Sequence, residues 1–224
     1  MLGARRTAQR SRGPDQAERR STPVDDLERD LKAQTLPSEP PQETLAGVTE
    51  RAEREGLVDV AYATVDSPMG ELLLAATPTG LARVAYPVNG HDAVLADLAR
   101  RLSPRVLEAP ARLEQARREL DEYFEGRRQE FELPLDLSLT RGFSRRVLDA
   151  TAAIGFGEQL TYRDVARVAG SERAVRAAGN ALGANPVPVV VPCHRVLRSG
   201  GGLGGYTGGL ENKRFLLGLE GLTI

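Results

Sequence analysis

The sequence has one cysteine, two histidines, two lysines and no tryptophan. A single cysteine excludes an internal disulfide and suits a reducing compartment, so we expect a cytoplasmic protein. One cysteine and two histidines also cannot build a Cys-rich structural zinc site, and we expect no bound metal. No apolar run approaches the roughly 20 residues that a membrane span requires, and the N-terminus lacks the apolar core of a signal peptide. These absences predict a soluble intracellular protein.

Charge is distributed unevenly, although the net charge is only −1. From Leu139 onward the sequence has eleven Lys and Arg residues and six Asp and Glu residues. This part therefore carries +5, and the rest of the chain carries −6. A basic half favours contact with phosphates, although solvated helix faces also produce such an asymmetry.

Residues 1–57 differ in composition from the rest of the chain. They contain no aromatic residue and are rich in Arg, Glu, Gln, Ser and Pro. Short helices are possible at 25–32 and 42–55, but neither has enough apolar surface to fold alone. We predict that this segment is a flexible or loosely docked extension.

Strand patterns begin at residue 58. Three β-branched or apolar runs, separated by the turn sequences SPMG and TPTG, predict an antiparallel meander at 58–67, 71–77 and 81–87. Helical apolar spacing follows at 91–102 and 111–125, and 131–137 could return as a strand. We expect a small α/β domain at 58–137 without a catalytic signature of its own.

The pattern from residue 138 onward is mainly helical. Helices are predicted at 143–153, at 161–168 with Thr161 as the cap, and at 171–182 with Ser171 as the cap. The last two, joined at Gly170, resemble a helix-turn-helix. A small-residue face on the third helix suits either close helix packing or approach to a DNA groove.

The single cysteine follows the apolar run 189–191 and is flanked by Pro192 and His194. We interpret the run as a strand that delivers Cys193 to its end. A thiol is a nucleophile only as thiolate, and a neighbouring imidazole can act as its base. Most lone cysteines are packing residues, so the residues alone leave both roles open.

A glycine-rich loop at 200–209 precedes a helix that starts near Leu210. Such loops can hold phosphates, but this one lacks the Gly-Lys-Ser/Thr ending and a surrounding βαβ unit. A loop that wraps closely around a flat ligand fits better, with Tyr206 and Thr207 exposed on it.

Taken in order, the segments NPVPVVVPCHRV (185–196) and GGYTGGLENKRFLL (204–217), followed by Glu220 and Gly221, resemble the O6-alkylguanine-DNA alkyltransferases. The resemblance is dense over 143–221, weaker over 58–137 and absent from 1–57. It implies an α+β fold, with a ribonuclease H-like α/β roll at 58–137 and a winged-helix-like domain at 138–224 that carries the site. It also implies a monomer that binds double-stranded DNA containing O6-alkylguanine, without a membrane and without a cofactor.

The resemblance assigns a role to each matching residue. Cys193 would accept the alkyl group, His194 would take its proton through a water, and Glu220 would polarise the histidine. Asn185 would sit in the hinge between the recognition helix and the active-site strand. The resemblance also implies substrate and DNA contacts. Tyr162 would donate to the departing guanine, and Arg176 would enter the duplex. Tyr206 and Thr207 would line the pocket, with the Thr207 N–H near the leaving O6, while Lys213 would support the pocket tyrosines and Val196 would be a further contact.

The implied function is DNA repair by irreversible, single-turnover transfer of an alkyl group from O6-alkylguanine to Cys193, with O4-alkylthymine left open as a second substrate. Two alternative functions explain less of the sequence. A winged-helix protein that binds lesions or regulates without chemistry would leave Pro-Cys-His-Arg and Glu220 unexplained. A cysteine hydrolase would need an acyl pocket and an oxyanion site, which the sequence does not reveal.

Overall fold

The computed structural model describes residues 47, 49, 51, 52 and 54–222. These residues belong to the compact unit Ala46–Ile224. The helix predicted at 25–32 lies outside them, whereas residues 47, 49, 51, 52 and 54 of the helix predicted at 42–55 are helical. Ala52 is buried in a small cluster with Val58, Ala61 and Ala109, so the described end of the predicted extension packs on the sheet. None of the helices described is both long and apolar enough to cross a membrane.

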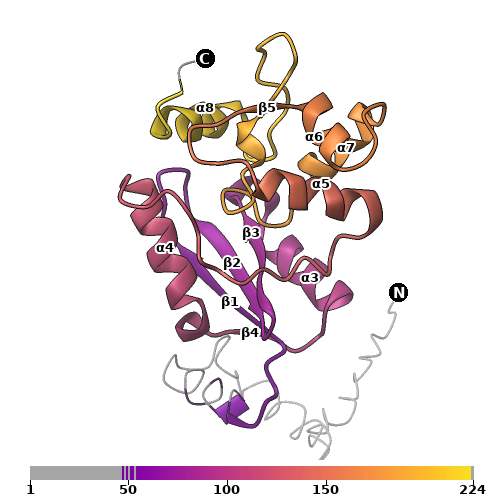
Figure 1. Ribbon diagram of the computed structural model, residues 1–224. Helices are drawn as coiled ribbons and strands as arrows, with labels where there is room; N and C mark the ends of the chain where they lie inside the picture. The colour runs from indigo at the N-terminus through magenta and orange to yellow at the C-terminus, as the bar shows by residue number, and fades with distance from the viewer. Residues whose placement is uncertain (1–46, 48, 50, 53, 223–224) are drawn as a thin grey trace, which may run out of the picture. The chain divides into compact units, whose positions relative to one another are not determined.

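A four-stranded sheet forms the first half of this unit, in the order β3-β2-β1-β4 (Figure 1). Strands β1 (Val60–Val65), β2 (Leu72–Thr77) and β3 (Gly80–Ala85) form the predicted antiparallel meander. The short strand β4 (Val106–Glu108), which was not predicted, pairs parallel with β1.

The strand predicted at 131–137 is wrong. Only an isolated bridge between Leu81 and Leu135 forms there, supported by backbone hydrogen bonds from Leu81 to Pro134 and from Asp136 to Leu81. Proline has no N–H to donate, so Pro134 prevents a longer ladder.

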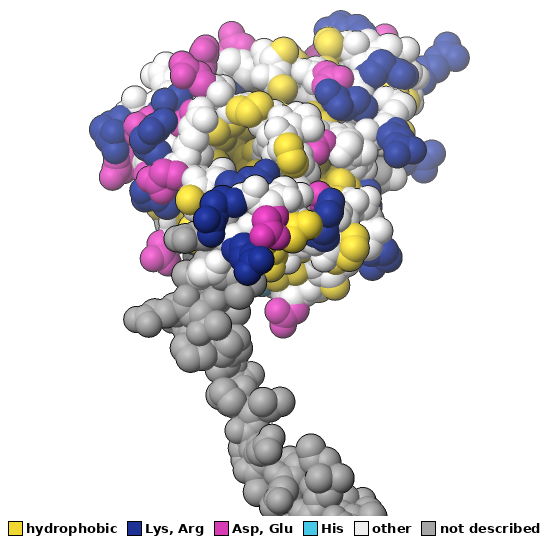
Figure 2. Space-filling view, turned by 90° about the horizontal axis from the view of Figure 1, so that it is seen from below, with side chains coloured by type: hydrophobic (Ala, Val, Ile, Leu, Met, Phe, Trp, Pro, Cys, Tyr) yellow, Lys and Arg dark blue, Asp and Glu magenta, His cyan; other side chains and the backbone are white. Residues whose placement is uncertain are grey.

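Helices cover both faces of the sheet (Figure 1). Leu72 and Leu74 of β2 pack with residues of α4 (Glu114–Phe124), whereas Leu73 and Ala75 pack with residues of α3 (His91–Arg101). Successive side chains of a strand point to opposite faces, so a strand buried on both sides is apolar throughout. At the end of the unit seen in Figure 2, basic and acidic side chains are interspersed rather than gathered in one patch.

The second half consists of α5 (Gly142–Ala152), α6 (Tyr162–Val168), α7 (Val175–Gly183) and α8 (Leu210–Leu219). Thr161 caps α6 as predicted: its hydroxyl accepts from the Asp164 N–H, and the Asp164 carboxylate accepts from the Thr161 N–H. The two-residue strand β5 (Leu160–Thr161), directly before α6, pairs parallel with the two-residue strand β6 (Val196–Leu197).

Helix α7 starts at Val175, so the predicted start and cap at Ser171 are wrong. The Ser171 N–H donates to Ala166 and closes the end of α6, while the Ser171 carbonyl accepts from Ala174 in a separate turn. Ser171 therefore belongs to the connection between the helices. The small residues Ala178 and Ala181 are buried against α5 and α6, which supports the interpretation of that face as close helix packing.

Candidate active site

The segment that leads to Cys193 is a turn, and the predicted strand at 189–191 is wrong. The Val191 N–H donates to the Val187 carbonyl, and Val189 has a positive φ of 74°. Cys193–Arg195 then form a single 3₁₀ turn before β6. Prolines at 186, 188 and 192 cannot donate to a ladder, so the apolar character of the run reflects burial, not extension.

Asn185 holds this turn from inside. Its side-chain NH₂ donates to the Val191 carbonyl (2.8 Å), and its side-chain oxygen accepts from the Val187 N–H (3.1 Å). The residue is buried between the end of α7 and the Cys193 segment. Both ends of the turn are thus fixed by one side chain, at the hinge position that the resemblance implied.

Cys193 is a buried, free cysteine. Burial raises the pKa of its thiol, and this outweighs the opposite effects of a hydrogen bond with Asn185 and the charge of Lys213. The resting side chain is therefore the neutral thiol, which needs a base before it can act as a nucleophile.

Behind the cysteine, a fully buried polar cluster surrounds Glu220. Its carboxylate accepts from His194 Nε2 (2.8 Å), Tyr123 Oη (2.6 Å) and the guanidinium of Arg195 (2.8 and 2.9 Å). The Gly157 N–H adds a bond of 3.2 Å. Burial alone would raise the pKa of Glu220, but the hydrogen bonds from His194 and Arg195 lower it to about 2. Glu220 is therefore ionised.

The same cluster fixes the tautomer of His194. Burial lowers the pKa of His194 despite the opposite effect of Glu220, so the imidazole is neutral near pH 7. An ionised carboxylate only accepts hydrogen bonds, so the proton of the neutral ring is on Nε2. Nδ1 is then an acceptor, and it is buried without a hydrogen-bond partner among the described residues. His194, the residue after Cys193, thus has a ring nitrogen, Nδ1, that is available to accept a proton.

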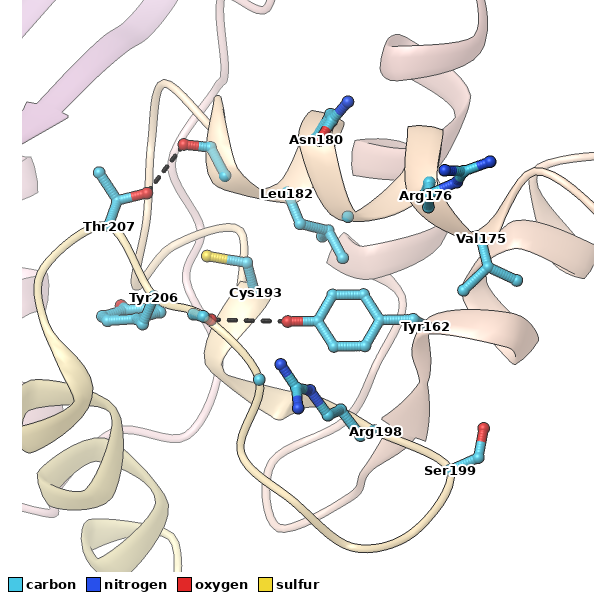
Figure 3. Close-up of a pocket in the computed structure, with 14 residues that line it drawn as sticks. Tyr162, Val175, Arg176, Asn180, Leu182, Cys193, Arg198, Ser199, Tyr206 and Thr207 are labelled. Atoms are coloured by element: carbon cyan, nitrogen blue, oxygen red, sulfur yellow. Dashed lines mark hydrogen bonds between the residues drawn. The ribbon is translucent and has the colours of Figure 1, made fainter.

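A cavity of about 670 Å³ opens in front of Cys193 (Figure 3). Its walls are Tyr162, the side of α7 that carries Arg176 and Gly179, and the loop at 204–207. The sulfur of Cys193 lies between α7 and this loop. Pockets of roughly 300–1,000 Å³ accommodate whole small organic ligands, so a purine base with a substituent fits in size.

Tyr162 and the loop are in close contact. The Tyr162 hydroxyl lies 3.5 Å from the Gly205 carbonyl, and a Cβ on Gly204 would lie 2.5 Å from that hydroxyl. Gly204 also has a φ of +71°, so both space and conformation require glycine here. Thr207 is exposed as predicted, and its hydroxyl ties the loop to the Gly183 carbonyl at the end of α7 (2.8 Å).

Tyr206 is half-buried, so its predicted exposure is wrong. Its hydroxyl lies 2.6 Å from that of Tyr86, and the two rings meet edge to face. Burial raises the pKa of Tyr206. Tyr86, directly after β3, was not singled out from the sequence. Contact with it holds the Tyr206 ring inward, while Tyr206 still lines the cavity.

Two other implied contacts differ from the expectation. The buried Lys213 donates to the carbonyls of Val196 (2.7 Å) and Leu203 (2.5 Å), so its ammonium holds the backbone beside the pocket and makes no hydrogen bond to a pocket tyrosine. Burial lowers the pKa of Lys213 to about 8. The Val196 side chain is buried in the core with α5, α6 and α7 and does not line the cavity. Its β-branched side chain suits that core better than a ligand contact.

Arg176 is exposed at the cavity, and its guanidinium makes no hydrogen bond or ion pair with the described residues. Arg198, which was not predicted, also lines the cavity and points toward Tyr162 (Figure 3). Tyr123, the second omission, lies 97 positions before Glu220 and gave no local signal. Among the described residues, no group of three or more His, Cys, Asp and Glu side chains could hold a metal ion.

Comparison with known proteins decides which family has this site. A model of the 6-O-methylguanine DNA methyltransferase ribonuclease-like domain matches residues 60–137, and a model of the DNA-binding domain of the same methyltransferase matches residues 142–222. The chain belongs to the 6-O-methylguanine DNA methyltransferase family. The resemblance and the two-part α+β fold expected from the sequence are thereby confirmed.

Individual relatives of this methyltransferase family cover most of the chain. A methylated-DNA–protein-cysteine methyltransferase of Mycolicibacterium paratuberculosis is 39% identical over 72% of this chain and 92% of its own length. The protein of that name from Homo sapiens is 38% identical over 70% of this chain and 79% of its own. A crystal structure of Mycobacterium tuberculosis OGT in complex with DNA has a TM-score of 0.61 at 37% identity, covering 71% of this chain and 92% of that one.

Proposed function

We propose that this protein repairs alkylated DNA directly, by moving an alkyl group from the O6 of guanine to the sulfur of Cys193. The observation that carries the proposal is the neutral His194, with Nδ1 unpartnered among the described residues, beside a buried thiol that borders a cavity of about 670 Å³. The names of the relatives and the DNA-bound structure of one of them support the same reaction.

The reaction begins with a proton transfer. The Cys193 thiol gives its proton, through a water, to Nδ1 of His194, and Glu220 stabilises the imidazolium through the hydrogen bond at Nε2. The Cys193 sulfur attacks the alkyl carbon, an S–C bond forms, and the C–O6 bond breaks with its electron pair going to guanine. The Tyr162 hydroxyl donates a hydrogen bond to the departing base, and the Thr207 N–H stabilises the charge on O6. The guanine then takes a proton from solvent, and the His194 imidazolium returns its proton to solvent, so the protons balance.

The product explains why each molecule acts once. A thioether on Cys193 is stable to hydrolysis, and no side chain that lines the described cavity is a nucleophile strong enough to remove the alkyl group. Transfer is therefore irreversible and needs no cofactor. The protein is consumed in proportion to the lesions that it repairs.

Access to the sulfur requires that the damaged nucleotide leave the helix. A stacked base cannot place its O6 against Cys193, so the nucleotide is extruded into the cavity, at a cost of a few kcal/mol. Arg176, exposed on α7 and without an internal partner among the described residues, enters the duplex and fills the gap. Phosphate contacts of the basic C-terminal part offset the rest of the cost.

The wider assignment follows from this reaction. The partner is double-stranded DNA that contains O6-alkylguanine, bound by a cytoplasmic monomer that associates with the nucleoid. The ribonuclease-like domain spans 58–137, and the DNA-binding domain spans 138–224. Asn185 and Lys213 fix the backbone around the cysteine, and Tyr206 forms a wall of the pocket.

Intact-protein mass spectrometry tests the proposal. After incubation with a duplex containing one O6-methylguanine, the protein should gain the mass of one methyl group, located on Cys193 by peptide mapping. Cys193→Ser should bind the duplex but gain no mass. Binding without any mass gain in the wild type would indicate a lesion-binding protein, and repeated turnover would indicate a hydrolase; either result would refute the proposal.

A further inference from the structure

A second cavity, of about 190 Å³, lies where β3, the end of α3 and the start of α5 meet. Three arginines line it: Arg83 from β3, Arg101 from the end of α3, and Arg141 directly before α5. The hydroxyl residues Thr140 and Ser144 complete its polar lining, and no acidic side chain contributes to it. This concentration of positive charge has no role in the alkyl transfer described above.

The arginines of this cavity are incompletely paired. The Nε of Arg83 is buried and has no hydrogen-bond partner among the described residues, and burial lowers the pKa of its guanidinium. The Arg141 side chain makes no hydrogen bond or ion pair within the described part of the chain. Arg101 donates to the Leu139 carbonyl (2.9 Å) and lies 3.4 Å from Asp97. Buried donors without an acceptor are costly, so the cavity is built to receive acceptor atoms.

The first turn of α5 adds to the same effect. The helix has eleven residues, its N-cap residue Arg141 provides no side-chain hydrogen bond, and no acidic residue lies in its first turn. The free N–H groups and the positive end of the helix dipole favour an anion there. Ser144, in this first turn, lines the cavity and can donate through its hydroxyl.

We infer that this cavity binds one phosphate-type oxyanion between Arg83, Arg101 and Arg141. Its volume is below the roughly 300–1,000 Å³ of pockets that hold whole small-molecule ligands, yet it exceeds the roughly 30 Å³ of a water several times. One tetrahedral oxyanion fits, whereas a nucleotide does not. Arginine, with its planar fork of donors, suits such a ligand.

Two sources could supply this anion, a phosphate of the DNA backbone or free phosphate. Ala184, at the C-terminal end of α7, borders the cavity, and Arg176 lies near the other end of that helix at the Cys193 pocket. A nine-residue helix is about 13 Å long, so the two ends of α7 are separated by a span that a few nucleotides of a DNA strand can bridge. The assignment to a DNA phosphate rests on the proposed function, but the oxyanion site itself does not.

Titration with inorganic phosphate at constant ionic strength tests the site on the full chain. Calorimetry and thermal denaturation should show saturable binding to the wild type, and both Arg83→Gln and Arg141→Gln should lose it. Arg141 is exposed, so its variant keeps the test valid if Arg83→Gln folds poorly. Arg118→Gln, which removes an exposed arginine of α4 outside the cavity, should behave as the wild type.

The salt dependence of binding to an unmodified duplex separates the two sources. If the anion is a DNA phosphate, Arg141→Gln should lower the slope of log K against log salt by about 0.9, and Arg118→Gln should not. An unchanged slope together with saturable phosphate binding identifies a free anion. The site is refuted if phosphate does not bind and the slope is unchanged in both cavity variants.

Reaction with the free O6-alkylguanine base provides the remaining control. This substrate has no phosphate, so Arg83→Gln and Arg141→Gln should be alkylated on Cys193 at the wild-type rate. Loss of the oxyanion site therefore leaves alkyl transfer measurable, and a failure of alkyl transfer in the wild type leaves phosphate binding measurable. The experiments can therefore refute either proposal without refuting the other.

Discussion

Tyr123→Phe removes one oxygen atom from the buried cluster around Glu220. The Tyr123 hydroxyl donates to Glu220 at 2.6 Å, and both side chains are buried. A hydrogen bond to a charged group contributes about 1.5–3 kcal/mol to stability. The ring itself remains packed against Phe124, Phe131 and Phe156. We therefore expect the free energy of unfolding to fall by about 1.5–3 kcal/mol, with no cavity term.

The same substitution should leave the chemistry largely intact. Glu220 keeps its hydrogen bonds from His194, Arg195 and the Gly157 N–H, so the carboxylate stays paired and the His194 tautomer stays fixed. The rate of reaction with the free O6-alkylguanine base should change by less than about tenfold, because the hydrogen bond at His194 Nε2, which the proposed proton transfer uses, is retained.

Thermal denaturation and single-turnover kinetics measure these two effects. For a chain of this length, 1 kcal/mol corresponds to about 2–4 °C, so Tm should fall by roughly 3–12 °C. Tyr62→Phe is the matched control, since the Tyr62 hydroxyl in β1 makes no hydrogen bond with the described residues, and its Tm should stay within roughly 2 °C of the wild type. An unchanged Tm in Tyr123→Phe would refute the stabilising bond, and a stable variant that accepts no alkyl group would place Tyr123 in the chemistry.

Four further predictions test the rest of the site. Glu220→Gln should lower the free energy of unfolding, measured with denaturant, by about 3–5 kcal/mol, because it leaves the buried Arg195 without its carboxylate partner. The variant should also transfer the alkyl group more slowly. A variant as stable as the wild type would contradict a stabilising ion pair. The transfer rate should stay flat from pH 8 to about 6.5 and decline only below, since burial lowers the pKa of His194 beneath its ordinary 6.5; a decline centred above 7 would contradict a neutral imidazole. The free energy of unfolding should fall with acid in two pH ranges. Below about pH 6.5, His194 takes up a proton in the unfolded chain but not in the folded chain. Between pH 4.5 and 2, Glu220 is protonated in the unfolded chain but still ionised in the folded chain. Arg176→Ala should lose repair of duplex DNA but react normally with the free base; equal losses on both substrates would remove its proposed role in extrusion.

The sequence predicted elements whose signals are local. Turn sequences at 67–70 and 77–80 and the apolar runs between them define β1 to β3, and the Thr161–Asp164 capping box defines the start of α6. The strand predicted at 189–191 is wrong because the apolar composition of this run reflects its burial, and three nearby prolines cannot donate the hydrogen bonds of a strand ladder. The helix cap predicted at Ser171 is wrong because the Ser171 N–H donates to the Ala166 carbonyl at the end of α6, and no local sequence pattern indicates this bond.

The site was predictable only where one segment carries it. Cys193 and His194 are adjacent, and Glu220 followed from the family resemblance. Tyr123 reaches Glu220 from helix α4, across 97 positions, and Tyr86 reaches Tyr206 across 120, so only the folded chain brings them together. Lys213 shows the converse case: its identity was predicted, but its hydrogen bonds go to the Val196 and Leu203 carbonyls.

Burial of the site controls both the stability of the resting protein and its reactivity. The low-polarity surroundings raise the pKa of Cys193 and lower that of His194, so the pair rests as thiol and imidazole, without charge. A cysteine that is used once must not be lost to other electrophiles, and a neutral buried thiol is protected in this way. In the proposed reaction, the extruded base displaces most of the water from the cavity, and proton transfer to His194 through a remaining water creates a poorly solvated thiolate beside the alkyl carbon, where attack is fastest. Glu220 is held ionised by hydrogen bonds from His194, Arg195 and Tyr123, so in the proposed reaction it can stabilise the imidazolium without rearrangement. The carboxylate of the buried ion pair is thus a fixed negative charge that becomes important only when His194 is protonated during the proposed reaction.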